Sequence, residues 1–178
     1  MKITVYKIEA AKAQLLEAIN LFFEERDPIP IHTLVGAALG ILNDLIADKD
    51  LVRDNQLIFH YDTIYIKDKY RKKFQKMINS HKNFFKHADL DLKKGLTTIA
   101  FNPELNQFFI FEAIRVSRII QPDFWPAEYK VFIYWIMKQY PNLFNNVEEE
   151  LLRLMQDPFL QTKADFKWAT ATLKKSPV

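Results

Sequence analysis

Groups that could move protons or bind a metal are concentrated between His81 and Asp91 (HKNFFKHADLD). The chain has only four histidines, and two of them lie in this stretch with two aspartates and an asparagine. A histidine titrates near neutral pH and can act as an acid or a base. Asn83 and His87 are four residues apart, so on a helix they meet on one side. They form the first candidate functional pair.

A metal site is the alternative use of the same stretch. Imidazole and carboxylate groups such as His87, Asp89 and Asp91 suit zinc, manganese or iron. Spacings of two do not align on a helix, so this site requires the helix to end near Ala88. The simpler interpretation is that both aspartates are loop carboxylates. We therefore expect neither a metal nor a cofactor.

The element that must position these groups is a helix expected from 67 to 88. Its apolar stripe recurs at three- and four-residue spacing and comprises Tyr70, Phe74, Met77, Ile78, His81, Phe84, Phe85 and Ala88. His81 lies on this stripe, so we interpret it as a core or interface histidine. Lys76, Ser80, Asn83 and His87 share one flank, whereas Lys82 lies on the other.

Positive charge is concentrated in the same region. Residues 67–94 contain ten Lys or Arg and three Asp, a net charge of +7, whereas the whole chain carries +3. Such an asymmetry can attract phosphates. The candidate RNA-binding residues are Lys72, Lys73, Lys76 and Lys86. The alternative is a solvated helix face of lysines.

The block from Lys82 to His87 resembles the signature of the HEPN superfamily of small all-α proteins. That signature is an Arg, usually followed by a polar residue, and then a His several positions further on. Asn83 and His87 match it, whereas Lys82 stands where the family has Arg and cannot bind a phosphate in the bidentate manner of a guanidinium. The NFFKHAD block is also similar to that of uncharacterised bacterial proteins of about this length. Arg26-Asp27 with His32 matches the same pattern across two prolines.

The resemblance implies a metal-independent endoribonuclease or a degenerate RNA-binding relative. In that superfamily two motifs meet at a dimer interface, and the His does acid/base chemistry at the ribose 2′-hydroxyl. Lys82, Asn83 and His87 are then the catalytic candidates. Lys82 and His87 are about 140° apart on an ideal helix, so a bent helix or a partner protomer must bring them onto one phosphate. The resemblance also leaves open an antitoxin-like partner, which no residue identifies.

The rest of the chain is expected to form a single all-α domain, 1–178, of five to seven helices in a HEPN-like up-and-down bundle. One short extended or irregular segment is expected at 57–66, a loop around Gly95, and a C-terminal segment at 157–178 that docks as a tail. The other expected helices span residues 5–25, 31–47, 102–120, 126–140 and 146–156. The first of these carries an apolar stripe, and the helix at 31–47, apolar over much of its girth, is expected to be the central, buried one. The stripe comprises Ile8, Ala11, Leu15, Ile19, Phe22 and Phe23.

Local signals set several of these boundaries. Asp27-Pro28-Ile29-Pro30 is expected to end the first helix, because neither proline donates an amide. Asn102-Pro103 is a helix start, with Asn102 as the cap. Gly36 and Gly40 indicate a close approach of another backbone. His32, at the first turn of the second helix, is expected to be buried and hydrogen-bonded.

Composition excludes several classes of function. The 178 residues are 49% hydrophobic, contain no cysteine, and carry no glycine-rich phosphate loop, HExxH motif or serine elbow. Without a signal peptide or a run of 18 to 20 apolar residues, we expect a cytoplasmic protein with no membrane partner.

Aromatic residues near the C-terminal half favour self-association. Phe124, Trp125, Trp135 and Trp168 motivate the prediction of a homodimer, which the superfamily's two-fold site also implies. Two functions from different classes therefore remain open. One is an RNA-directed module, catalytic or degenerate, and the other is a non-enzymatic helical protein for oligomerisation or partner docking.

Overall fold

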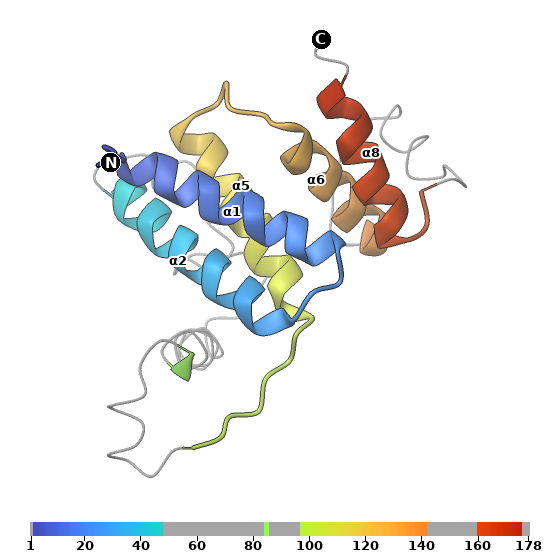
Figure 1. The fold of residues 1–178 in the computed structure, drawn as a ribbon, viewed down its shortest axis with the longest axis horizontal. Helices are drawn as coiled ribbons and strands as arrows, with labels where there is room; N and C mark the ends of the chain where they lie inside the picture. Colours follow the sequence, from blue (N-terminus) through green and yellow to red (C-terminus); the bar gives the residue numbers. More distant parts are fainter. Residues whose placement is uncertain (1, 48–83, 86–96, 142–159, 176–178) are drawn as a thin grey trace.

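The computed structural model describes residues 2–47, 84–85, 97–141 and 160–175, and this part of the chain is all-helical (Figure 1). The expected all-α class is confirmed there, since no strand occurs in the described ranges. Five helices lie in these ranges: α1 (Lys7–Phe23), α2 (Pro28–Ala47), α5 (Leu105–Ile120), α6 (Ala127–Gln139) and α8 (Lys163–Lys175). The expected segment at 57–66, the loop around Gly95 and the helices at 67–88 and 146–156 lie outside the described ranges, apart from Phe84 and Phe85.

Helix α1 ends through its own backbone rather than through the prolines that follow it. The amide of Arg26 donates to the carbonyl of Leu21 at 3.0 Å, and that of Glu25 donates to Phe22 at 3.2 Å. This pair of bonds is the Schellman motif, and it places Glu25 in the left-handed region at φ 54°. A glycine usually occupies that position, because a side chain there costs about 1 kcal/mol. The sequence has no glycine at this position, so the end of the helix was predicted from the prolines instead.

The two prolines instead belong to the first turn of α2, which corrects its predicted start at 31. The first four amides of a helix have no partner within it, so Pro28 and Pro30 lose no hydrogen bond there. The carboxylate of Asp27 accepts from the amide of Ile29 at 2.8 Å and so caps the helix. With only four residues between them, α1 and α2 form an antiparallel pair (Figure 1).

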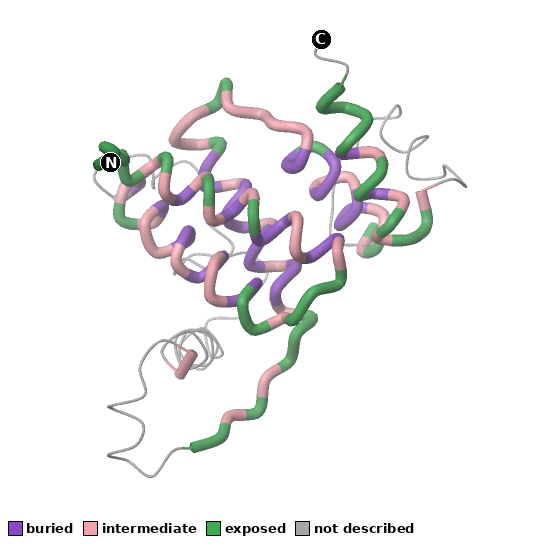
Figure 2. The backbone as a smooth tube through the Cα atoms, in the orientation of Figure 1, coloured by how far each residue is buried: buried purple, intermediate pink, exposed green. Residues whose placement is uncertain are grey.

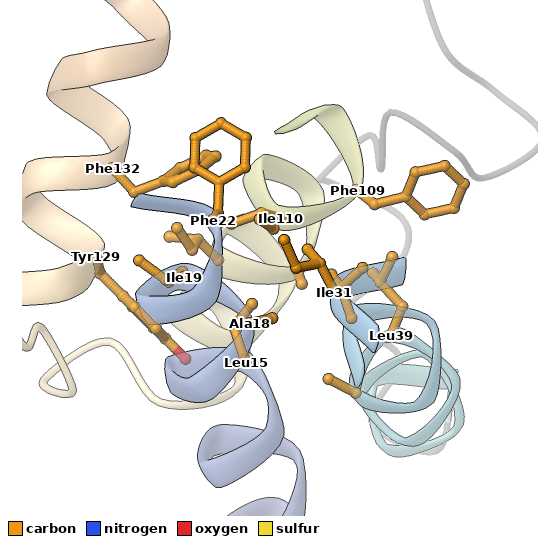
Figure 3. Close-up of a cluster of buried hydrophobic side chains, with 14 of the residues drawn as sticks. Leu15, Ala18, Ile19, Phe22, Ile31, Leu39, Phe109, Ile110, Tyr129 and Phe132 are labelled. Carbon is orange, nitrogen blue, oxygen red and sulfur yellow. The ribbon is translucent and has the colours of Figure 1, made fainter. Parts of the chain in front are cut away.

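The hydrophobic core lies where α1, α2 and α5 meet, and Figure 2 shows their facing sides as buried. The predicted stripe of α1 is confirmed, because Leu15, Ile19 and Phe23 are buried. Figure 3 shows side chains of α1, α2, α5 and α6 converging there. The fully buried members of this core with the largest side chains include Leu15, Ile19, Leu42, Ile46, Ile110, Ile114, Tyr129, Phe132, Ile136 and Phe166.

Helix α2 is the buried helix that its sequence predicts. It packs against both α1 and α5, and Gly36 lies buried on it. By length and composition, Pro28–Ile46 could also cross a membrane, although the sequence lacks an uninterrupted apolar run. Core helices pass the same test, and here Val35, Ala38 and Leu42 are enclosed by the protein. Of this apolar window 44% is buried inside the protein, so burial in the core accounts for the face of α2 that meets α1 and α5.

Helix α5 starts slightly later than predicted and ends where predicted. The side chain of Asn102 accepts from the amide of Glu104 at 3.0 Å, so it caps a turn that leads into the helix at Leu105. Near the other end, the Tyr129 hydroxyl of α6 donates to Ser117 at 3.3 Å. Burial raises the pKa of Tyr129 to about 12, so this phenol remains a donor well into the alkaline range.

The C-terminal segment, for which the sequence predicted a tail and no helix, contains helix α8, which packs against α6 and α1. Of its side chains only Phe166 and Thr170 are buried. The Phe166 ring stacks on Phe23 with centroids 6.0 Å apart and lies 5.8 Å from Tyr134. A capping box closes the start of the helix, in which Thr162 and the Asp165 carboxylate bond each other's amides at 3.3 and 2.7 Å. One aromatic side chain therefore provides most of the apolar attachment of α8.

Two aromatic residues on α8 should respond very differently to truncation. Phe166→Ala removes a fully buried ring and should lower the free energy of unfolding by about 3 to 5 kcal/mol. Trp168→Ala removes a larger but exposed ring and should change it by no more than about 0.5 kcal/mol. Urea denaturation followed by circular dichroism measures both. Equal losses in the two variants would contradict the described docking of α8.

Candidate functional site

The residues that the sequence predicts to be catalytic, metal-binding or RNA-binding lie outside the described ranges. This holds for the catalytic candidates Lys82, Asn83 and His87, and for Asp89 and Asp91 of the alternative metal site. It holds equally for the RNA-binding candidates Lys72, Lys73, Lys76 and Lys86. From the same block the structure describes Phe84, which is helical, and Phe85, which lies in a turn.

Phe85 is held in a group of aromatic rings that also contains His32, Phe101 and Phe109, which we call the aromatic box. The His32 ring lies edge-on to Phe85, Phe101 and Phe109, with centroid separations of 5.6, 5.1 and 5.0 Å. Phe85 and Phe101 are themselves perpendicular at 5.2 Å. Edge-to-face pairs of this kind stabilise by about 0.5 to 1.5 kcal/mol each beyond their burial. Phe85 of the NFFKHAD block is thereby packed against α2 and α5.

Asn106 fixes the imidazole inside the box. Its amide nitrogen donates to the carbonyl oxygen of Pro28 at 2.9 Å, which can only accept, so the amide oxygen faces His32 at 2.8 Å. The Nδ1 atom of His32 therefore carries a proton and donates it to that oxygen. His32 is 1% exposed, so the predicted buried, hydrogen-bonded histidine is confirmed. It acts as a bridge between α2 and α5 rather than as a group open to substrate.

The second sequence match to the HEPN-type pattern does not form a site. Arg26 is exposed in the loop after α1, where its Nε atom pairs with the Glu24 carboxylate at 3.2 Å. Asp27 caps α2, and His32 is enclosed in the aromatic box. The arginine and the histidine therefore have separate structural partners, because the prolines start a helix between them.

No family model, no curated protein and no solved structure matches this chain. The likeness of the Lys82–His87 block to HEPN proteins therefore rests on the residues of that block. Within the described ranges, no group of three or more His, Cys, Asp or Glu residues could hold a metal ion.

The most exposed tryptophan lies on the outer side of α8. Trp168 is 67% exposed and lies opposite the buried Phe166 and Thr170 around the helix. Lysines follow one edge of this surface. Lys167 pairs with Glu24, the C-cap residue of α1, at 2.9 Å, and Lys174 pairs with the nearly buried Glu128 of α6 at 2.5 Å.

These lysines attach α8 without being withdrawn from solvent. The side chains of Lys167 and Lys174 are 56% and 51% exposed. The hydrogen bond from Lys167 is the main reason that the pKa of Glu24 is lowered, with Arg26 contributing next. Each ammonium group has three donors, so one carboxylate leaves the others available.

The other aromatic residues predicted for an interface have different roles. Trp135 is 6% exposed and packs against Phe22 at 4.8 Å, so it belongs to the core. The Lys12 ammonium lies over Phe124 at 3.9 Å, and the Arg118 guanidinium lies over Trp125 at 4.1 Å. The high frequency of aromatic residues in the sequence did not distinguish core side chains from surface ones. Helical periodicity places Trp135 and Trp168 equally well on a packed face. Of this aromatic set, only Trp168 keeps an open ring.

Sequence reasoning missed two polar residues that organise the structure. Asn106 on α5 is buried among apolar residues, and Glu128 on α6 is buried beneath Lys174. The burial of Asn106 could have been predicted from the sequence, because it lies one turn before the apolar Ile110 within a strongly hydrophobic helix. Glu128 gave no such signal, because an acid in the first turn of a helix is ordinarily a surface residue.

Removing the Asn106 amide should destabilise the protein by about 1 to 3 kcal/mol. Asn106→Ala leaves the Nδ1–H of His32 and the carbonyl of Pro28 without their present partner. Asn43→Ala on α2 is the matched control and should change the free energy of unfolding by at most about 0.5 kcal/mol. Chemical denaturation of the two variants provides the comparison. An Asn106→Ala protein as stable as the control would contradict the bridging role.

Proposed function

We propose that this protein is an RNA-directed helical module of HEPN type, either a metal-independent endoribonuclease or a degenerate RNA-binding relative. In this proposal His87 exchanges a proton with the ribose 2′-hydroxyl, and Asn83 and a cation bind the phosphate. Lys82 stands in the position of the family's arginine. Because a lysine contacts phosphate as a point charge, binding without efficient cleavage fits this chain as well as catalysis does.

The packing of Phe85 is the observation that carries the proposal. Asn83 and His87 are each two residues from Phe85 in the sequence, and Phe85 lies among His32, Phe101 and Phe109. The buried bond between His32 and Asn106 holds that box to α2 and α5. An anchor on a rigid core is what a site needs if its groups are to be placed within a fraction of an ångström.

Charge supports the same proposal. The segment 67–94 surrounds Phe85 in the sequence and carries a net charge of +7. A basic segment of this size supplies the salt-dependent attraction that dominates the affinity of proteins for nucleic acids. The all-helical character of the described residues agrees with the class of fold that the superfamily has.

A non-enzymatic role in self-association is the second candidate, and the exposure of Trp168 favours it. Exposed tryptophans are enriched at protein interfaces, where they act as binding hot spots. A homodimer would also serve the RNA-directed proposal, because the superfamily's site is built across a two-fold axis.

RNA binding and its salt dependence test the first proposal. The wild-type protein should bind single-stranded RNA at low salt, and the affinity should fall steeply toward physiological ionic strength. His87→Ala should abolish cleavage, or weaken binding if the protein does not cleave, and Lys82→Arg should raise activity. Fluorescence anisotropy and gel analysis of the RNA measure both properties.

His60→Ala is the matched control, since that histidine has no role in the proposal. Denaturation midpoints of the three variants separate an effect on function from an effect on folding. A stable His87→Ala protein with unchanged RNA behaviour would remove His87 from the site. No measurable affinity of the wild type at low salt would refute the RNA-directed function itself.

The homodimer is tested by mass in solution. Light scattering at high micromolar concentration should give twice the chain mass of 21.1 kDa. Trp168→Ala should shift the mass toward the monomer if α8 forms the interface, while Phe124→Ala should not. A monomeric wild-type mass would rule the dimer out.

A further inference from the structure

The indole of Trp168 has three small side chains and one carboxylate as neighbours on its own helix. Ala164, Ala171 and Thr172, each one turn away, are exposed. Asp165, three residues before Trp168, is half-buried, and its carboxylate accepts hydrogen bonds from Thr162 and from the amide of Gln161. Thr172 directs its hydroxyl to the backbone carbonyl of Trp168 at 3.0 Å, away from the ring. Within the described part of the chain, no aromatic ring or cation packs against this indole. A flat aromatic face is therefore open to solvent at the middle of α8.

Positive charge lies beside and beyond that face. Helix α8 carries four lysines and one aspartate, a net charge of +3 over 13 residues. Lys175 is two turns from Trp168 and about 20° from it around the helix, so it lies on the same face. Lys167 and Lys174 lie about 100° and 120° to one side, and both are half exposed. The outer side of α8 thus combines one open ring with cations at several points along its length.

This combination suits a nucleic acid better than a protein. A protein hot spot normally lies within a continuous apolar patch that excludes water. The only other large exposed apolar side chain on α8 is Leu173, which lies about 140° from Trp168 around the helix. Single-stranded nucleic acids need only an aromatic face for a base and cations for the phosphates, and this face provides both.

We propose that the outer side of α8 is a binding platform for single-stranded RNA, on which a base stacks on Trp168 while Lys167, Lys174 and Lys175 contact phosphates. This inference rests on the proposed RNA-directed function and adds a second contact region to it. Stacking accepts every base, so the platform increases affinity with little preference for sequence. It therefore holds the strand without selecting the site of cleavage.

Titration with a fluorescein-labelled oligouridylate at low salt tests the platform. Trp168→Leu should weaken binding by about fivefold or more, the effect expected from the loss of one stacked base, whereas Trp168→Phe keeps a ring and should stay within about twofold. Lys175→Ala should reduce the slope of log affinity against log salt by about one. Ile29→Ala removes an exposed apolar side chain from α2 and serves as the control without effect.

Intrinsic fluorescence gives a second measurement. Unlabelled oligouridylate should quench the wild-type emission, and the quenching should largely disappear in Trp168→Leu, because the buried Trp135 and the Arg118-covered Trp125 remain shielded. Circular dichroism of the Leu variant confirms that the helices are intact.

Three outcomes would overturn the platform. Equal RNA affinity of the wild type and Trp168→Leu would refute it while leaving the RNA-directed function standing. Absence of RNA binding by the wild type at low salt would refute both. A change from dimer to monomer in Trp168→Leu with unchanged RNA affinity would show that α8 binds a second copy instead.

Discussion

Helix α2 is apolar over most of its length and packs against both α1 and α5, and the arrangement of the described core follows from the burial of its apolar surface. Exposing that surface to water would be unfavourable in proportion to its area. Helix α1 covers part of it through the hairpin made by the Schellman turn at Glu25 and Arg26. Helix α5, far away in the sequence, covers another part. Of the remaining described helices, α6 packs against both α1 and α5, and α8 packs against α6 and α1 (Figure 1).

The start of α2 is where this packing meets the candidate site. Asn106 on α5 is bonded both to Pro28 and to His32, so the first turn of α2 is fixed in position and in rotation. The edges of three phenylalanine rings close around the imidazole, and one of these rings is Phe85. A buried polar bond is costly to leave unmade, so this bridge permits one register of α2 against α5. The block that carries Asn83 and His87 is attached to the same point.

The two regions that we connect with function, the aromatic box and the outer side of α8, differ in their exposure to solvent. In the aromatic box His32 and Phe109 are buried, whereas Phe85 and Phe101 are half-buried, and the box contributes by holding one point of the NFFKHAD block. The outer side of α8 is exposed, and on the inner side of this helix one buried ring, that of Phe166, packs against α1 and α6. Its lysines serve twice, since they bond Glu24 and Glu128 while half of each side chain remains in solvent. A strand of RNA that reached both regions would be held by positive charge contributed from distant parts of the sequence.

The sequence by itself determined the class of fold and most of the helices. Apolar periodicity predicted the stripe of α1, the burial of α2 and the extent of α6. A helix that is buried on one face has apolar residues that recur about every 3.6 positions in the sequence. The position of His32 in the first turn of α2 predicted its burial. Only the tertiary structure decided that the two prolines begin α2, since the αL turn at Glu25 involves a residue that has no marked preference for it. Only packing could distinguish the buried Trp135 from the exposed Trp168, or pair His32 with Asn106 across 74 residues of chain. Such pairings depend on which helix faces come together, and local sequence patterns do not encode that choice.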